Sequence, residues 1–312
     1  MNKINNKVLL GILLVLLLIF LGKRFLGSSD ERNFKETLVA IDTSQVNKIV
    51  IQPRASGGDN ITFTKTGMDW EVASADIKDD ADINNVKSML ANMVNMKPKR
   101  LVAKSEDKWT QYEVNDSLGT RVMAYAGEKL LTDFILGKFN FQQASRSMSN
   151  FVRLGDEEDV YSVEGFLSSS FSQEFNNFRD RTFVKTTKDN VMSIRFEYPA
   201  DSSFVLSKMG TQWQIGELQA DSAAVESYLS GLGNITKNEF ADDFVPQGKV
   251  ATYRLTVSGN NMQAFTVSAF LEGEEYILNS SLNEGAYFEE GSLKIFEKLF
   301  VGKAGLLPEE QE

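Results

Sequence analysis

The sequence predicts an α+β protein: a tandem duplication of one mostly antiparallel sheet unit with packed helices, behind one N-terminal transmembrane helix. Three observations predict this architecture. An apolar segment lies near the N-terminus, a strand–turn–strand pattern occurs twice, and a helical pattern follows it both times. The clearest trace of the duplication is KTGMDWEV at 65–72, which is repeated as KMGTQWQI at 208–215. A chain of 312 residues has room for two units that each bury a core.

The N-terminal segment has the length of a membrane span. Residues 8–21 read VLLGILLVLLLIFL, and apolar residues continue to about residue 27 around Lys23 and Arg24. About 20 apolar residues cross a bilayer, and the two basic side chains can extend to its interface. A cleaved signal peptide is the alternative, but no small-x-small cleavage site follows. We therefore expect a short tail at 1–7, an uncleaved signal anchor at 8–27 and a linker at 28–44.

The part of the chain after the anchor is acidic. The net charge is −10, but the first 27 residues carry four positive charges and no negative ones, so the remainder stands at −14. Such a surface repels phosphate backbones and argues against a nucleic-acid partner. The basic residues on the two sides of the anchor are nearly balanced. A single anchor before a large body favours export. We expect a single-pass protein of the bacterial inner membrane, with its body in the periplasm or cell exterior.

The two repeats are expected at 45–186 and 187–303, followed by an acidic tail at 304–312. In each repeat a glycine, Gly67 or Gly210, provides the positive φ that a hairpin turn requires. Trp70 and Trp213 then occupy equivalent places on the second strand, where we expect them to anchor the two cores. Each repeat continues with a helix, two further hairpins and a closing helix. The expected helical segments are 81–93 with Asp82 as the N-cap, 164–180, 220–232 with Asp221 as the N-cap, and 292–302.

The residue types available exclude several chemistries. The chain has no cysteine and no histidine, which rules out disulfides, thiolate nucleophiles, Ser-His-Asp triads and His- or Cys-ligated metals. SEDK at 105–108 has Ser-x-x-Lys spacing, but KTG at 65–67 precedes it, in the wrong order for a penicillin-recognising enzyme. The acidic runs at 78–82 and 155–159 lack EF-hand spacing. We therefore predict no catalytic, cofactor-binding or metal residues, and a protein that is not an enzyme.

An aromatic run precedes the predicted boundary. Phe171, Phe175 and Phe178 recur at helical spacing, which is typical of core packing and alternatively indicates a face that docks a partner. The segment FRDRTF at 178–183 follows directly. Its charged residues, Arg179, Asp180 and Arg181, are expected to form ion pairs that lock the two repeats together.

The anchor, the strand–Gly–x–x–Trp–strand unit with its Asp-capped helix, and FRDRTF after the Phe-rich run resemble the domain of unknown function 4340 family. The resemblance implies a membrane-anchored bacterial envelope protein, of a kind often encoded beside gliding-type ABC transporters, with no catalytic residues to carry over. We expect a non-catalytic accessory or scaffold subunit of an ABC-type export or gliding-type machine, in complex with its membrane subunits. The alternative is a binding module for an envelope glycan, peptide or lipid in the cleft between the repeats. A carboxylate-based hydrolase is a third hypothesis.

Overall fold

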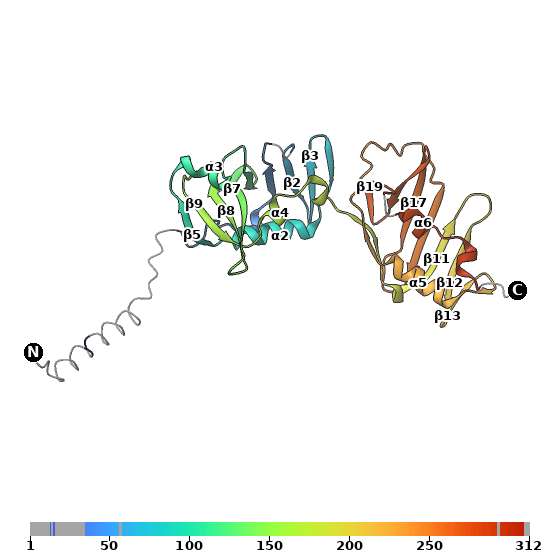
Figure 1. Ribbon diagram of the computed structural model, residues 1–312. Helices are drawn as coiled ribbons and strands as arrows, with labels where there is room; N and C mark the ends of the chain where they lie inside the picture. Colours follow the sequence, from blue (N-terminus) through green and yellow to red (C-terminus); the bar gives the residue numbers. More distant parts are fainter. Residues whose placement is uncertain (1–12, 14, 16–34, 56–57, 292–293, 309–312) are drawn as a thin grey trace, which may run out of the picture.

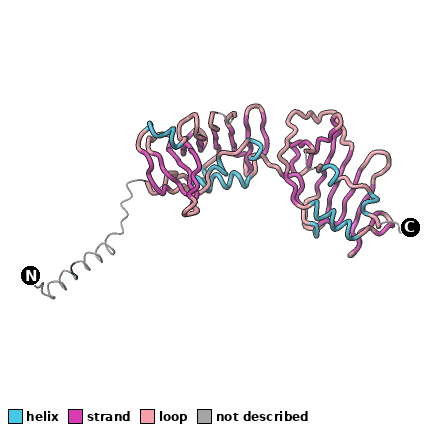
Figure 2. Tube along the Cα trace, viewed as in Figure 1, coloured by secondary structure: helices cyan, strands magenta, loops and turns pink. Residues whose placement is uncertain are grey.

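The computed structural model describes residues 13, 15, 35–55, 58–291 and 294–308. The predicted tail and anchor therefore lie outside the described residues, apart from Leu13 and Val15, which are both helical. The helices that the structure describes are all too short or too polar to cross a bilayer. Two large antiparallel sheets make up most of the body, and they form two lobes that lie side by side (Figures 1 and 2).

The first lobe is a nine-stranded sheet in the order β4-β3-β2-β1-β6-β7-β8-β9-β5. Helix α2 lies along this sheet, and α3 and α4 are single turns. Its elements are β1 Lys48–Gln52, β2 Ile61–Thr66, β3 Asp69–Ser74, β4 Ile77–Asp80, α2 Ile83–Val94, β5 Pro98–Ala103, α3 Trp109–Tyr112, β6 Thr120–Ala126, β7 Lys129–Gln142, β8 Ser147–Leu154, β9 Val160–Glu164 and α4 Ser168–Phe171.

The second lobe is an eight-stranded sheet in the order β14-β13-β12-β11-β16-β17-β18-β19, with a separate strand pair formed by β10 and β15. Helix α5 lies along this sheet as α2 does along the first. Its elements are β10 Thr182–Lys185, β11 Val191–Glu197, β12 Phe204–Met209, β13 Gln212–Ile215, β14 Leu218–Gln219, α5 Ser222–Leu232, β15 Asn234–Thr236, β16 Tyr253–Gly259, β17 Phe265–Glu272, β18 Glu275–Ser280, β19 Asn283–Glu289 and α6 Ile295–Leu299.

The two sheets share one strand order. Read from β4 to β9, the first sheet matches the second from β14 to β19, strand for strand. Beyond β9 the first sheet adds β5. Beside β19, residues 239–241 take that place: Phe240 forms a β-bridge with Phe288, and Ala241 N–H donates to the Tyr287 carbonyl. The prediction of mostly antiparallel sheets is confirmed, and the described helices are few.

The repeated hairpins and helices form for local reasons. Gly67 and Gly210 have φ of +68° and +62°, in the left-handed region that glycine adopts without strain. The Asp82 carboxylate accepts the Asn84 N–H at 2.8 Å and caps α2. The equivalent Asp221 accepts the Ala224 N–H at 2.7 Å and caps α5. Each cap satisfies one of the backbone donors that a helix N-terminus leaves free.

Each lobe has its own aromatic core. Trp70 and Trp213 are 5% and 8% exposed and belong to the first and second core, respectively. In the first core Phe178 packs edge-on against Phe63, with ring centroids 5.2 Å apart. The second core contains a chain of aromatic contacts that begins at Phe196. Further fully buried phenylalanines are Phe134 and Phe171 in the first core, and Phe183, Phe265 and Phe288 in the second.

The closing helices are much shorter than predicted. The expected helix at 164–180 is only α4, followed by a 3-10 turn at Phe175–Asn177, because the backbone at Glu174 is extended (φ −69°, ψ 152°). Of the helix expected at 292–302, residues 292–293 lie outside the described residues, and the rest forms only α6, which ends at Leu299 because the Phe300 backbone leaves the helical region (φ −99°, ψ 69°). Burial follows the apolar spacing at Phe171, Phe178, Leu299 and Phe300, which the chain buries without continuing the helix, whereas Phe166 is 48% exposed.

Two segments predicted to lie outside the repeats belong to the cores. Leu38 and Val39, in the predicted linker at 28–44, are 7% and 2% exposed, and Leu38 N–H donates to the Met96 carbonyl. Leu306, in the predicted tail at 304–312, is 2% exposed, and its carbonyl accepts the Asp221 N–H. The same bond in the first lobe joins Phe178 to Asp82, so Leu306 is the counterpart of Phe178.

Candidate functional site: the junction between the lobes

The segment FRDRTF at 178–183 carries the chain from the first lobe to the second, through the yellow-green part of the ribbon in Figure 1. On the first lobe, Asp180 N–H donates to the Asp80 carbonyl at 2.7 Å, and Arg179 forms a β-bridge with Ala81. On the second lobe, the Asn283 side-chain amide donates to the Asp180 carbonyl at 2.7 Å. The backbone of this segment is therefore bonded to both lobes.

Arg179 lies at the centre of the junction and is 3% exposed. Its Nε donates to Asp79 of β4 at 2.9 Å. Its Nη1 and Nη2 donate to the two carboxylate oxygens of Asp242 at 2.9 and 2.7 Å, and Nη1 also donates to Asn176 at 3.2 Å. The guanidinium stacks 3.4 Å from the ring centre of Phe240. One side chain thus binds a carboxylate of each lobe.

This geometry fixes how the lobes meet. A bidentate arginine–carboxylate pair is directional, so it holds orientation as well as contact. The Arg179 and Asp79 charges are buried and remain stable there only while they are paired, whereas Asp242 is 32% exposed. The predicted locking ion pairs are therefore present at Arg179. They are not formed by its two neighbours: the Asp180 carboxylate accepts the Thr182 N–H, and Arg181 Nη1 donates to the Asn177 side chain.

A pocket of about 450 Å³ opens beside Arg179 between the lobes. Its walls carry the carboxylates of Asp69, Asp80, Asp82 and Asp180. Burial first, and then the charges of neighbouring aspartates including Asp180, raise the pKa of the Asp80 carboxyl above its usual value. The other charged side chains on the wall are Arg181 and Lys185, and Trp70 and Thr236 complete much of the lining.

A second hollow, of about 700 Å³, is lined by residues of both lobes. Ile77 of β4 contributes one wall, and residues of the loop after Phe240 contribute the opposite wall. Lys249 pairs with Glu272 at its rim and lies 4.5 Å from the ring centre of Phe244. The lining also includes the aromatic residues Phe240 and Phe244 and the acidic residues Asp242, Asp243 and Glu289.

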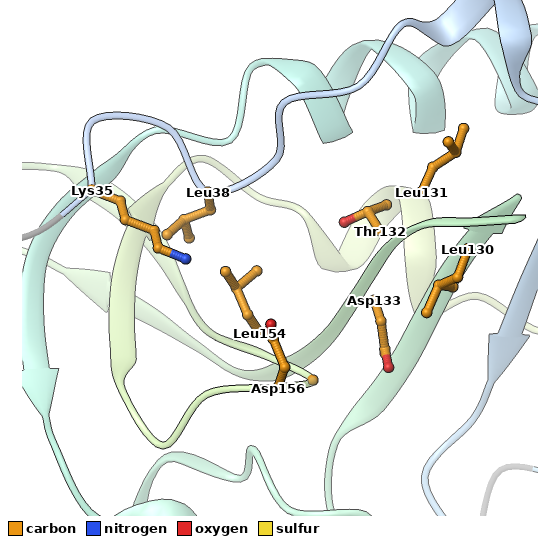
Figure 3. Close-up of a pocket in the computed structure, with 9 residues that line it drawn as sticks. Lys35, Leu38, Leu130, Leu131, Thr132, Asp133, Leu154 and Asp156 are labelled. Carbon is orange, nitrogen blue, oxygen red and sulfur yellow. The ribbon is translucent and has the colours of Figure 1, made fainter.

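A third pocket, of about 400 Å³, belongs to the first lobe alone (Figure 3). Leu38 and Leu154 line it, and the Lys35 side chain extends towards it. Arg121 holds Asp133 through two hydrogen bonds of 2.9 and 2.6 Å. Lys35 itself pairs with Glu157. Lys35 and Asp133 therefore have partners, and Asp156 is the third charged residue that lines this pocket.

The other candidates from the sequence form ordinary structural contacts. The hydroxyl of Ser105 donates to Asp107, and Lys108 pairs with the same carboxylate. Tyr161 donates to Glu157 in the acidic hairpin, and burial together with that carboxylate raises the pKa of the Tyr161 hydroxyl. Among the described residues, no group of three acidic side chains is arranged to hold a metal ion.

The residues singled out from the sequence lie in different places. Trp70 is both a core residue and part of the junction pocket wall, whereas Trp213 packs only in the second core. Phe171 and Phe178 are fully buried in the first core, so the predicted partner face is wrong for these two residues. Phe175 is half-buried, with its ring centre 5.5 Å from the Arg179 guanidinium.

Two junction residues were missed by the sequence analysis. Asp79 and Asp242 are the ion-pair partners of Arg179. Strand pairing places Leu218 at the position equivalent to Asp79, because Asp79 pairs with Val72 and Leu218 pairs with Ile215. The sequence shows an aspartate in one repeat where the other has leucine, but the burial of Asp79 and its pairing with Arg179 appear only in the structure.

These features define a class of protein. It has two lobes, each built on an antiparallel sheet with the same strand order, and a buried arginine at their junction binds a carboxylate of each lobe. The chain belongs to the family described as Domain of unknown function (DUF4340), whose family model matches residues 70–258. The match runs from Trp70 to β16 and includes the complete crossing segment. Comparison with curated proteins and with solved structures gives no significant match.

Proposed function

We propose that this chain is a non-catalytic, membrane-anchored envelope protein that acts as an accessory or scaffold subunit of an ABC-type export or gliding-type machine. The Arg179 junction is the observation that carries the proposal. It binds Asp79 and Asp242 and stacks on Phe240, which makes two lobes into one platform of fixed geometry. A scaffold needs such a fixed geometry, because partner sites on different lobes must keep their spacing.

The architecture supports the remaining parts of the proposal. The equal strand order of the two sheets supports a tandem duplication. The apolar segment at 8–27 supports a single span in the bacterial inner membrane, and the acidic body supports a location in the periplasm or cell exterior. The choice of an ABC transporter as partner comes from the family resemblance, which is an association and not a contact.

The test is affinity purification of the full-length chain, tagged at its C-terminus, from native membranes in mild detergent, followed by mass spectrometry. The proposal expects an ABC ATPase and its membrane subunits to be recovered in fixed proportion. The Arg179→Gln variant should lose these subunits while remaining in the membrane. The matched variant Arg121→Gln, which breaks an ion pair within the first lobe, should retain them. Recovery of the chain alone would refute the scaffold role.

A second candidate function is a binding module for an envelope ligand in the junction pocket. The four carboxylates of its wall favour a ligand with a positive charge, such as a peptide or an amino sugar with a free amine. Isothermal calorimetry with cell-wall peptide fragments tests this function. Binding should weaken on acetylation of the ligand amine and in the Asp69→Asn variant. Equal binding of free and acetylated fragments would contradict it.

A further inference from the structure

The hairpin between β7 and β8 exposes a group of large apolar side chains. Strand β7 is 14 residues long, but β6 pairs with it only as far as Leu136. The remaining part of β7 pairs with β8 alone and extends beyond the sheet. On this extension Phe139 and Phe141 are 39% and 54% exposed, and Met148 of β8 is 45% exposed. Together with Phe166 we call these residues the hairpin patch.

The hairpin patch forms one continuous surface. Phe141 and Met148 are direct cross-strand partners, so their side chains lie on the same face, and Phe139 precedes Phe141 by two residues. Phe166, which is 48% exposed, packs edge-on against Phe139 with ring centroids 4.8 Å apart. A register shift between Leu136 and Phe139 places these aromatic residues on the face that continues Val152 of the core. The face of the sheet that packs in the core thus continues onto the exposed hairpin.

The hairpin itself carries a charge opposite to that of the chain, and Glu164, a carboxylate at its base, pairs with Lys99. From 134 to 155 the sequence contains no aspartate or glutamate, although the chain as a whole carries −10. The exposed side chains of Lys138 and Arg146 flank the patch, and Arg146 lies at the turn. Exposed aromatic residues beside cations are suited to the interface of an anionic bilayer, where apolar rings enter the acyl boundary and cations bind headgroups.

The second lobe provides an internal comparison. The strand order makes β17 and β18 the counterparts of β7 and β8. That hairpin is short: β17 ends at Glu272 and β18 begins at Glu275, with Gly273 and Glu274 at the turn. Its tip therefore carries three glutamates, and Leu271 there is 50% exposed. Of these two hairpins, only β7–β8 is extended and cationic, and it belongs to the lobe that directly follows the anchor segment.

The length of the chain allows the patch to reach a membrane. Seven residues, 28–34, separate the predicted anchor from Lys35, and they span at most about 25 Å when extended. Lys35 pairs with Glu157 just beyond the C-terminal end of β8, and the hairpin turn lies at the opposite end. Eight residues of strand cover about 26 Å, so the spacer and the strand have matching lengths.

We propose that the hairpin patch is a second membrane contact, which inserts its aromatic residues into the interface of an anionic bilayer. This inference rests on the anchoring that is part of the proposed function. With the anchor at one end of the first lobe and the patch at the other, the lobe would lie against the bilayer. The second lobe would then project from the membrane towards its partners.

The absence of cysteine makes a direct test possible. The full-length chain carrying Phe141→Cys is labelled with an environment-sensitive fluorophore and reconstituted into vesicles of phosphatidylcholine with an equal part of phosphatidylglycerol. We expect a blue-shifted emission that a headgroup-bound nitroxide quenches. The matched variant Leu271→Cys, on the acidic hairpin, should give an unshifted and unquenched signal. Circular dichroism verifies that both variants are folded.

The cations are tested in the same vesicles. Adding Lys138→Gln and Arg146→Gln to the labelled chain should reduce the inserted fraction. Each lost cation should lower the equilibrium constant for insertion by about fivefold. Pure phosphatidylcholine should have a comparable effect. Emission from Phe141→Cys that is unshifted in anionic vesicles would overturn the inference, as would shielding that appears only when co-purified membrane subunits are present. Flotation at alkaline pH tests the anchor separately: a chain that floats with an unquenched label refutes the hairpin contact alone.

Discussion

Replacing Arg179 with methionine should weaken the protein at one defined place. Methionine keeps part of the packing against Phe240 but removes all four hydrogen bonds of the guanidinium. The Asp79 side chain, 8% exposed, would then remain buried without its counter-ion, whereas Asp242 is 32% exposed and can be hydrated. Breaking a buried pair in this way costs about 3–5 kcal/mol. We expect most of that loss to come from Asp79.

The assay is urea unfolding of the full-length chain in mild detergent, combined with hydrogen exchange of peptides from each lobe. In the unmodified protein, the two lobes should unfold together, because the junction couples them. In Arg179→Met we expect a lower urea midpoint and separate transitions for the two lobes. Amides of the crossing segment, including the Asp180 N–H that donates to Asp80, should exchange much faster while both cores stay protected.

A control variant and a double variant test whether the loss comes from the Arg179–Asp79 pair. Arg121→Met breaks a pair within the first lobe in which Arg121 and Asp133 are 37% and 15% exposed, so it should cost less than Arg179→Met and should not separate the transitions. Combining Arg179→Met with Asp79→Asn should cost less than the sum of the single changes, by about 1 kcal/mol or more. The reasoning fails if Arg179→Met unfolds with the same midpoint as the unmodified chain, or if the double variant is strictly additive.

Three further changes test other parts of the structure. Trp70→Ala should cost about 3–5 kcal/mol in urea unfolding, because it empties a core site that is 5% exposed, and a loss below about 1 kcal/mol would contradict its core role. Gly259→Ala should lower the melting temperature, since the added methyl would overlap the backbone carbonyl of Asn190, and an unchanged melting temperature would show that this turn can shift. Asp80→Asn should raise stability at neutral pH. Folding raises the pKa of the Asp80 carboxyl, so its negative charge opposes folding once the pH exceeds the pKa of this carboxyl in the unfolded state. Below that pKa the carboxyl is protonated in both states, and the stability gain from Asp80→Asn should vanish. Urea midpoints of both proteins measured from acidic to neutral pH check this. A stability gain from Asp80→Asn that grows as the pH falls would contradict the prediction.

The parts of the fold that the sequence predicts correctly are those with local causes. A glycine at the turn, a tryptophan three residues later and an aspartate before an apolar helical pattern identify the hairpin and helix of each repeat. These signals act within about 20 residues. Gly67 and Asp82 therefore predict their turn and cap without knowledge of the rest of the chain.

The parts that the sequence does not predict depend on distant residues. Strand β10 forms because it pairs with β15, some 50 residues later, and its own sequence, TFVK, is too short to show a pattern. The Phe-rich run has helical spacing but folds as short turns, because burial of Phe171 and Phe178 against the sheet takes priority over helix continuation. The partners of Arg179 lie 100 and 63 residues away, so no local pattern could identify them.

Differences between the two repeats indicate where the lobes have separate roles. Positions that agree, such as Trp70 and Trp213, are explained by packing in both cores. At β4 the first repeat has Asp79 where the second has the half-exposed Leu218, and only the first position faces another lobe. The β7–β8 hairpin is aromatic and cationic, whereas its counterpart is short and acidic. These two differences make the lobes unequal. The first lobe carries the surface suited to a bilayer on its β7–β8 hairpin, and it carries the junction with the second lobe at its β4 edge. If the hairpin contacts the membrane, the ion pairs of Arg179 determine the angle at which the second lobe leaves it, and loosening that junction should disturb partner binding without releasing the protein from the bilayer.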